Sequence, residues 1–241
     1  DLCEKIKDLQ NQINFSAILL QGVTGSGKTE VYLEAVANAL RKGEQILVLL
    51  PEIALTSEFF NRVKNRFGAN PAEWHSGVTL AERRRVWKMV ASGDAKLVIG
   101  ARSALFLPFM NLGLVIVDEE HDHSYKQEDG VIYNARDMAV LRSSIERSTV
   151  ILASATPSLE SWVNAKNGKY NHVQIHERYG DASLPNLSAI DLRKENLKSD
   201  EWISDRLEKS ITECLQNSEQ SLLFLNRRGY SPLSLCVECG Y

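Results

Sequence analysis

A glycine-rich segment near the N-terminus has the residue types and spacing of a phosphate-binding loop. Gly22–Thr29 is GVTGSGKT, which fits the pattern G-x-x-x-x-G-K-[ST]. Glycines let the backbone curve around phosphates, and a following helix adds partial positive charge at its N-terminus. The Lys28 amine can reach the β- and γ-phosphates, and the Thr29 hydroxyl can bind Mg²⁺. We expect a magnesium–nucleotide complex to contact Gly22, Thr24, Gly25, Ser26, Gly27, Lys28 and Thr29.

Two acidic residues follow an apolar run farther along the chain. Asp118 and Glu119 come directly after Leu114–Val117, an expected buried strand. A strand end beside a phosphate loop is where Mg²⁺ must be held, so Asp118 is the expected carboxylate on the metal, directly or through water. Glu119 can act as general base on the attacking water. The pattern therefore predicts nucleotide hydrolysis, with Lys28, Asp118 and Glu119 as catalytic residues.

Two weaker features accompany these acids. His121 ends the string DEEH at a separation suited to relaying between the nucleotide site and another segment, and we include it among the catalytic candidates. A lone histidine is more often a local hydrogen-bonding residue. Ser154–Thr156 (SAT) follows another apolar run, and small hydroxyl residues at a strand end can bind the carboxylates and respond to loss of phosphate.

Apolar runs alternate with segments of helical periodicity through most of the chain. Expected strands are Ala17–Leu20, Gln45–Leu50, Glu73–Trp74, Leu97–Ile99, Leu114–Val117 and Thr149–Ala153. Expected helices are Thr29–Lys42, Leu55–Phe67, Leu80–Ala91 and Asn134–Glu146, after a polar helical segment within residues 1–16. Strands that are apolar throughout are buried on both faces, as in a parallel sheet covered by helices. The alternation predicts a doubly wound α/β fold.

The pattern changes in the last quarter of the chain. Residues 176–200 are polar and irregular, which favours a linker. A helix over Ile203–Leu215 and a strand over Leu222–Leu225 are expected to begin a second domain. The expected organisation is a first domain over residues 1–175, a linker over 176–200, and the beginning of a second domain with half of a metal-binding module over 201–241.

Composition limits the class of protein. The net charge is −3 at pH 7 with an isoelectric point near 6.0, a balance that does not favour a nucleic-acid binder, although a local basic strip could serve. No apolar run reaches the ~18 residues of a membrane span, and residues 1–8 are charged rather than apolar like a signal peptide. We expect a soluble cytoplasmic protein.

Cys236 and Cys239 form a C-x-x-C pair, which predicts half of a zinc site because structural zinc takes four ligands.

The phosphate loop, DEEH and SATP resemble, in their order and spacing, the superfamily 2 helicases. The finer resemblance is to the bacterial primosomal replication-restart helicases of the PriA family. It rests on GVTGSGKTEVY (22–32), LPEIALT (50–56), HSG (75–77), IGARSALFLPF (99–109), VDEEHDHSYKQEDG (117–130), YNARDMAV (133–140), SATPSLES (154–161), FLNRRGY (224–230) and CVECG (236–240). DEEH followed by SYKQ and YxARD is more specific than a phosphate loop alone.

The resemblance implies a RecA-like P-loop NTPase fold and an ATP-driven DNA helicase that moves 3′ to 5′ at stalled forks and D-loops. Members have an N-terminal DNA-binding region, two RecA-like lobes and a module with two zinc ions, so this chain resembles the first lobe and the start of the second. The implied cofactors are ATP, Mg²⁺ and Zn²⁺. The implied partners are forked and single-stranded DNA, primosome proteins, single-stranded DNA-binding protein and the loader of the replicative helicase, in the bacterial cytoplasm at the nucleoid.

The resemblance also implies roles for individual residues. Cys236 and Cys239 would bind zinc in the full-length protein. The segment Ser124–Tyr133 is similar to the family's aromatic-rich loop, which couples single-stranded DNA to ATP hydrolysis. Bases could stack on Tyr125 or Tyr133, with Lys126 nearby. Arg102 is expected at a strand end on the DNA-facing side.

Some positions depart from the family or stay open. The adenine-reading glutamine is not identified, with Gln10 and Gln12 as candidates, and Ala101 stands where threonine is common. Arg83, Arg84, Arg85 and Lys88 form either a solvated helix face or a DNA contact, and Arg227 and Arg228 could touch DNA or the other lobe.

Alternatives to a helicase also remain at this stage. One is a DNA-structure-binding scaffold for primosome loading in which ATP turnover is secondary. Another, a P-loop kinase or GTPase, is disfavoured by DEEH and SAT. An arginine from a partner lobe contributes about 10³–10⁵-fold in related reactions, so we expect this chain alone to bind nucleotide with little turnover and no unwinding.

Overall fold

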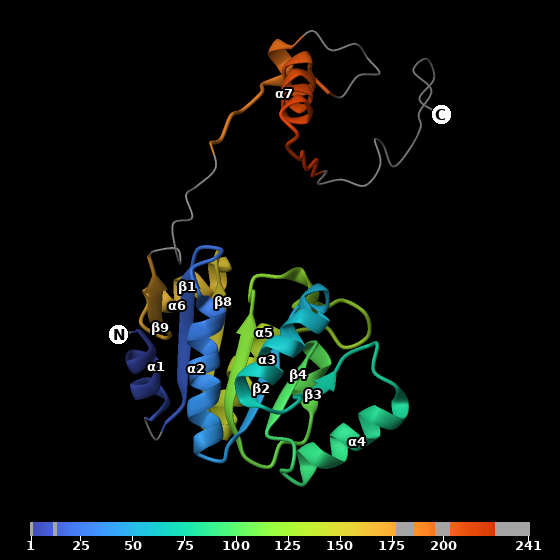
Figure 1. Ribbon diagram of the computed structural model, residues 1–241. Coiled ribbons are helices and arrows are strands. Elements are labelled where there is room, and N and C mark those ends of the chain that lie inside the picture. Colours follow the sequence, from blue (N-terminus) through green and yellow to red (C-terminus); the bar gives the residue numbers. More distant parts are fainter. Residues whose placement is uncertain (1, 12–13, 177–185, 196–202, 225–241) are drawn as a thin grey trace. The chain divides into compact units, whose positions relative to one another are not determined.

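The computed structural model describes residues 2–11, 14–176, 186–195 and 203–224. The chain divides into two units, Asp1–Ala182 and Ser183–Tyr241. The first unit contains every element of the main sheet (Figure 1).

The first unit is built on a parallel sheet. Among the described residues the sheet has seven strands in the order β3-β4-β2-β5-β8-β1-β9. Their bounds are β1 Ser16–Gly22, β2 Gln45–Leu49, β3 Ala72–Trp74, β4 Leu97–Gly100, β5 Leu112–Asp118, β8 Thr149–Ser154 and β9 Asn171–Ile175. Strand β8 lies between β1 and β5, with Gln21 paired to Ser154 and Asp118 paired to Ala153. The phosphate loop and the DEEH segment therefore begin at neighbouring points on one edge of the sheet.

Helices cover both faces of this sheet (Figure 1). Their bounds are α1 Leu2–Gln10, α2 Lys28–Arg41, α3 Ser57–Phe67, α4 Leu80–Ala91, α5 Ala135–Glu146 and α6 Leu159–Lys166. Along β2, Ile46 and Val48 belong to the core cluster under α1, α2 and α3, whereas Leu47 and Leu49 belong to the cluster under α4, α5 and α6. Because successive side chains of a strand point to opposite faces, one apolar run supplies both cores.

Side chains at the helix N-termini help to set where the helices begin. Thr56, Thr79, Asn134 and Ser158 each accept a hydrogen bond from a backbone N–H in the first turn of α3, α4, α5 and α6. Such caps satisfy N–H groups that have no partner inside the helix. The N-terminus of α2 is different, because Gly27 precedes it and supplies no side chain.

The predicted doubly wound α/β fold is confirmed, and each predicted element of the first domain corresponds to an observed one. The structure adds α6, β9 and a hairpin of β6, Lys126–Gln127, and β7, Tyr133–Asn134. These were missed because they are short, and because β9 is an edge strand in which only Val173 is buried.

The second unit contains one α-helix among its described residues, α7 (Asp205–Gln216), close to the expected Ile203–Leu215. The strand predicted over Leu222–Leu225 is wrong for its described part. Residues 221–224 form no strand, and Leu222 and Phe224 are 92% and 85% exposed. An apolar run becomes a strand only when a neighbouring strand pairs with its backbone, and the described residues provide none.

Candidate nucleotide-hydrolysis site

The phosphate loop connects β1 to α2 through a turn that requires glycine. Gly25 and Gly27 have φ of 79° and 85°, in the left-handed region that side chains disfavour. Gly22 is required for a different reason, because a Cβ there would lie 2.5 Å from Ser26 Oγ. The Ser26 hydroxyl is buried and has no hydrogen-bond partner among the described residues. A buried polar atom of this kind fits a loop that receives an acceptor such as phosphate.

Lys28 begins α2 and lies over the loop. Its side chain is largely buried, and Nζ donates to the carbonyl oxygens of Gly22, at 2.8 Å, and Val23, at 3.4 Å. The ammonium group is thus held at the loop by contacts that a phosphate oxygen can replace. Thr29 follows it in the first turn of α2.

Asp118 ends β5 and is held by two donors. Oδ2 accepts from the Tyr32 hydroxyl at 2.9 Å, and Oδ1 accepts from the Glu119 backbone N–H at 3.0 Å. Burial raises the pKa of Asp118, while the Tyr32 hydrogen bond acts to lower it. A nearby cation favours an ionised carboxylate, so this buried group fits Mg²⁺. Tyr32 was missed, although its position three residues after Thr29 on a helix predicts a shared face.

Glu119 has an unusual backbone conformation. Its φ is +46°, a left-handed value that costs free energy in a residue other than glycine and persists when the surroundings hold it. His121 Nδ1 lies 2.8 Å from Ser154 Oγ and 3.6 Å from Glu119 Oε2. The structure therefore brings together Glu119, His121 and the first residue of SAT.

Glu120 was not predicted, yet it is the most connected acid of this region. Its side chain is fully buried and accepts from the Ser158 backbone N–H, at 2.7 Å, and from the Ser158 and Ser161 hydroxyls, both at 2.9 Å. Arg136 Nη1 lies 3.5 Å from its Oε2. The sequence around Glu120 does not predict its burial or its role, because the residues that bind its carboxylate are distant in sequence.

One predicted nucleic-acid contact is wrong. The Tyr125 side chain is 1% exposed, and its hydroxyl lies 2.6 Å from the Asp118 carbonyl oxygen and 3.0 Å from that of Leu49. A base cannot stack on a buried ring, so Tyr125 joins β2 to β5 instead.

The other predicted contacts lie at the β6–β7 hairpin. Arg102 Nη1 donates to the carbonyl oxygens of Ser124, at 3.2 Å, and Lys126, at 2.7 Å, and so supports the segment that leads into the hairpin. Lys126 is exposed and pairs with Glu128 at 2.9 Å. Tyr133 is partly exposed and meets the exposed Phe106 ring edge to face at 5.2 Å.

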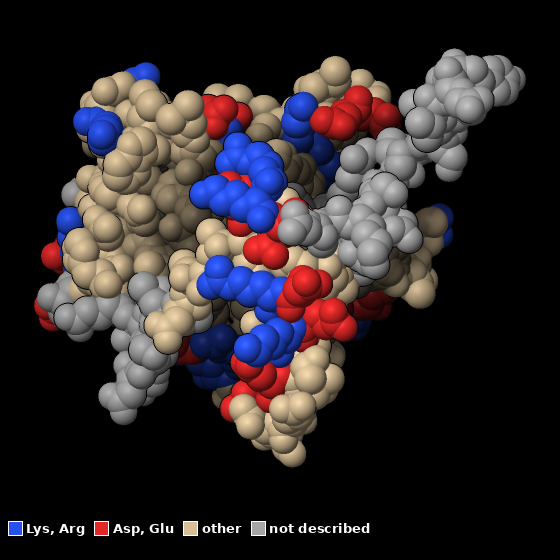
Figure 2. Space-filling model, turned by 90° about the horizontal axis from the view of Figure 1, so that it is seen from above, with Lys and Arg blue, Asp and Glu red and all other residues tan. Residues whose placement is uncertain are grey.

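Two of the four basic residues on α4 make local contacts. Arg83 donates to the His75 carbonyl oxygen at 2.7 Å and lies over the Trp74 ring, and Arg85 pairs with Glu82. On the face seen from above in Figure 2, which is not the α4 side, basic and acidic side chains are interspersed.

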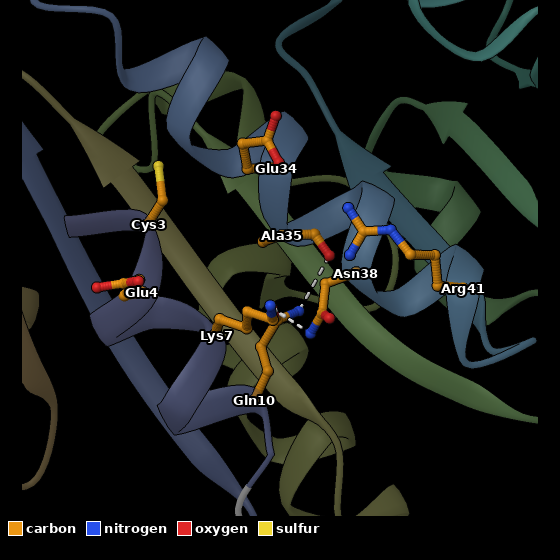
Figure 3. A pocket seen from close by; sticks show the side chains of 8 residues that line it. All are labelled: Cys3, Glu4, Lys7, Gln10, Glu34, Ala35, Asn38 and Arg41. Atoms are coloured by element: carbon orange, nitrogen blue, oxygen red, sulfur yellow. Dashed lines mark hydrogen bonds between the residues drawn. The ribbon is translucent and has the colours of Figure 1, made fainter. Parts of the chain in front are cut away.

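Gln10 is not free to read adenine. Its amide donates to the Ala35 carbonyl oxygen at 3.1 Å and accepts from Asn38 at 3.2 Å, in a small pocket between α1 and α2 (Figure 3). The pocket lies along the later turns of α2, whereas the phosphate loop ends in the first turn of α2. Gln10 therefore joins two helices.

Some predicted positions lie outside the described residues, namely Gln12, Arg227, Arg228, Cys236 and Cys239. Within the described ranges no cluster of metal-ligating side chains occurs. No helix in the described part of the chain is long and apolar enough to cross a membrane.

Comparison with known families decides the class of this site. The model for "DEAD/DEAH box helicase" matches residues 6–164, which include the phosphate loop, DEEH and SAT. This chain belongs to the DEAD/DEAH box helicase family. The match begins within α1 and ends within α6, so it covers every strand of the sheet except β9 and all the catalytic candidates.

Curated relatives refine the placement within the DEAD/DEAH box helicases. The chain is 49% identical over 243 residues to the replication restart protein PriA of Rickettsia felis, which covers 100% of the chain and 38% of the relative. It is 46% identical to PriA of Haemophilus influenzae, covering 94% and 31%, and 41% identical to PriA of Bacillus subtilis, covering 99% and 30%. The chain thus spans well under half the length of these relatives.

Solved structures support the helicase fold. The chain is similar to RecG bound to a three-way DNA junction, with a TM-score of 0.55, 22% identity, and coverage of 75% of this chain and 24% of that one. It is similar to the DUF1998 helicase MrfA, with a TM-score of 0.59, 17% identity, and coverage of 94% and 35%. At these identities the likeness concerns the fold alone.

Proposed function

We propose that this chain is the ATP-binding lobe of a DNA helicase that moves 3′ to 5′ in replication restart and primosome assembly. The observation that carries the proposal is the arrangement of Asp118 beside α2, where Tyr32 binds it one turn after Thr29. The curated relatives named as replication restart proteins support the biological setting.

In this proposal each side chain has a separate task. The phosphate loop and Lys28 bind the triphosphate, and Thr29 and Asp118 hold Mg²⁺, which when bound neutralises charge on the phosphates. Glu119 orients and deprotonates the attacking water. His121 connects Glu119 to SAT, since its Nδ1 lies close to both the Glu119 carboxylate and the hydroxyl of Ser154, the first residue of SAT.

Nucleic acid is proposed to bind at the β6–β7 hairpin. Tyr133 offers a partly exposed ring, and the exposed Lys126 lies in the same hairpin, paired with Asn134. Aromatic rings with nearby cations bind single strands with little sequence preference. Forked and single-stranded DNA are the proposed substrates, and primosome proteins the proposed partners. Zinc binding by Cys236 and Cys239 stays a prediction.

The decisive experiment is the ATPase rate of the full-length protein with and without forked DNA. Strong stimulation by DNA supports the motor. ATP binding without DNA-dependent turnover would instead favour a scaffold for primosome loading. The isolated chain provides a second test, because an arginine from a partner lobe is expected to contribute to turnover, so the chain alone is expected to bind nucleotide with little turnover. Robust DNA-stimulated hydrolysis by this chain alone would contradict that expectation.

A further inference from the structure

Glu120 lies where three functional segments meet. Its neighbour in the chain is the proposed base Glu119, and its own backbone N–H donates to the Ala153 carbonyl oxygen at 3.0 Å, just before SAT. Its carboxylate binds Ser158, the N-cap of α6, which follows SATP. A buried carboxylate with several donors has a defined position, because each unpaired group would cost free energy.

Arg136 connects the same carboxylate to the hairpin. The arginine side chain is 7% exposed and the Glu120 side chain 0%. Arg136 lies in the first turn of α5, and its backbone N–H donates to the Asn134 side chain, at the end of β7, at 3.0 Å. A continuous series of contacts therefore runs from β7 through Arg136 to Glu120.

Movement of Glu120 changes the backbone conformation of its neighbour Glu119. The two residues share a peptide group, and the left-handed φ of Glu119 is a conformation that persists only while neighbouring contacts hold it. The Glu119 peptide is fixed on one side by Asp118 Oδ1 and on the other by Asp122, whose N–H donates to the Glu119 carbonyl oxygen at 2.8 Å. A shift transmitted to Glu120 thus changes where the base points.

We propose that Glu120 is a positioning residue that, with Arg136, transmits the binding of single-stranded DNA at the β6–β7 hairpin to Glu119 and to SAT. This inference rests on the proposed function. A buried ion pair that served stability alone would, when broken, lower the folded fraction and so reduce the ATPase rate equally with and without DNA. A transmitting pair changes the ratio of those two rates.

The test measures that ratio, the stimulation factor, for the full-length protein with an oligothymidine strand. For Arg136→Gln we expect the stimulation factor to fall roughly tenfold, within the roughly 2- to 30-fold range of residues that carry coupling between sites. Arg136→Lys is measured if Arg136→Gln fails to fold. Lysine keeps the charge but has a single ammonium group, whereas Arg136 reaches Glu120 through Nη1, at 3.5 Å, and Asp137 through Nε, at 2.7 Å. Arg142→Gln is the matched control. Arg142 is a half-buried arginine on the same helix that binds the Leu107 carbonyl oxygen at 2.9 Å and Glu146 at 3.5 Å.

A double variant decides whether the two residues act in one series. If they do, the double variant Glu120→Gln/Arg136→Gln has a stimulation factor no lower than that of the single variant with the larger loss. Losses that multiply, or stimulation unchanged in Arg136→Gln and Arg136→Lys, would overturn the inference while leaving the helicase proposal intact. A wild-type protein with no DNA stimulation would overturn both.

Discussion

The Tyr32 hydroxyl donates to Asp118 Oδ2 at 2.9 Å and so joins helix α2 to the end of strand β5. Tyr32 is fully buried, and its helix begins with Lys28 and Thr29. The contact therefore sets the distance between the two proposed magnesium ligands, Thr29 of α2 and Asp118 of β5.

Tyr32→Phe is expected to lower the rate of ATP hydrolysis about tenfold, because a hydrogen bond to a charged group contributes roughly 1.5–3 kcal/mol. The bond favours ionised Asp118, and burial already raises that pKa. Removing this hydrogen bond raises the pKa of Asp118 further. As the pH is lowered, the variant should therefore lose activity at a higher pH than the wild type does. The pH–rate profiles of wild type and variant check this. If the activity of the variant fell at the same acidic pH as that of the wild type, Tyr32 would not act through Asp118.

Lys28→Ala is expected to abolish ATP hydrolysis in the full-length protein while DNA binding persists. The Lys28 amine donates to the loop carbonyls of Gly22 and Val23, outside the β6–β7 hairpin that is proposed to bind DNA. ATPase assays and fluorescence anisotropy with labelled DNA separate the two activities. Equal loss of both would count against the role assigned to Lys28.

Tyr133→Ala should weaken binding of single-stranded DNA by about 1–3 kcal/mol, since stacking contributes that much per base. Tyr125→Phe provides the contrast. Its ring is buried and its hydroxyl binds backbone carbonyls, so the loss should be about 0.5–1.5 kcal/mol of folding stability with DNA affinity retained. Anisotropy titrations and thermal melts distinguish the pair. DNA affinity equal to wild type in Tyr133→Ala would exclude stacking there.

Gly100→Ala should destabilise the first unit. A Cβ at the end of β4 would lie 2.3 Å from the Trp74 carbonyl oxygen, so β3 must move away, at a cost of about 1–3 kcal/mol or more. Gly77→Ala is the control, because its Cβ would meet only the His75 ring, at 3.2 Å. Chemical denaturation measures both. Similar losses in the two variants would show that the close approach at Gly100 does not limit packing.

Local pattern in the sequence was sufficient to predict most of the strands and helices of the first unit. The apolar runs predicted every central strand, and helical periodicity predicted α2 to α5, because side-chain period is a property of a few neighbouring residues. The phosphate loop and the DEEH acids were also visible, since each is a short contiguous string. Their proximity followed from the rule that parallel strands end at the same edge.

What local pattern could not supply was the identity of distant partners. Tyr125 has an aromatic ring that suits base stacking, yet the ends of β2 and β5 enclose it. Gln10 has the right amide for adenine, yet α2 binds it. Glu120 is one acid among several until α5 and α6 surround it with donors.

The amino-acid sequence by itself determined most strands and helices of the first unit and the chemical groups available for the proposed ATP hydrolysis, because period and residue type act locally. The tertiary structure alone decided which of those groups are exposed, which are buried, and which hold the others in place. The order of the strands sets this, since β8 between β1 and β5 brings SAT, the phosphate loop and DEEH to one edge. Burial then assigns each polar side chain to the partners that packing places within hydrogen-bonding distance.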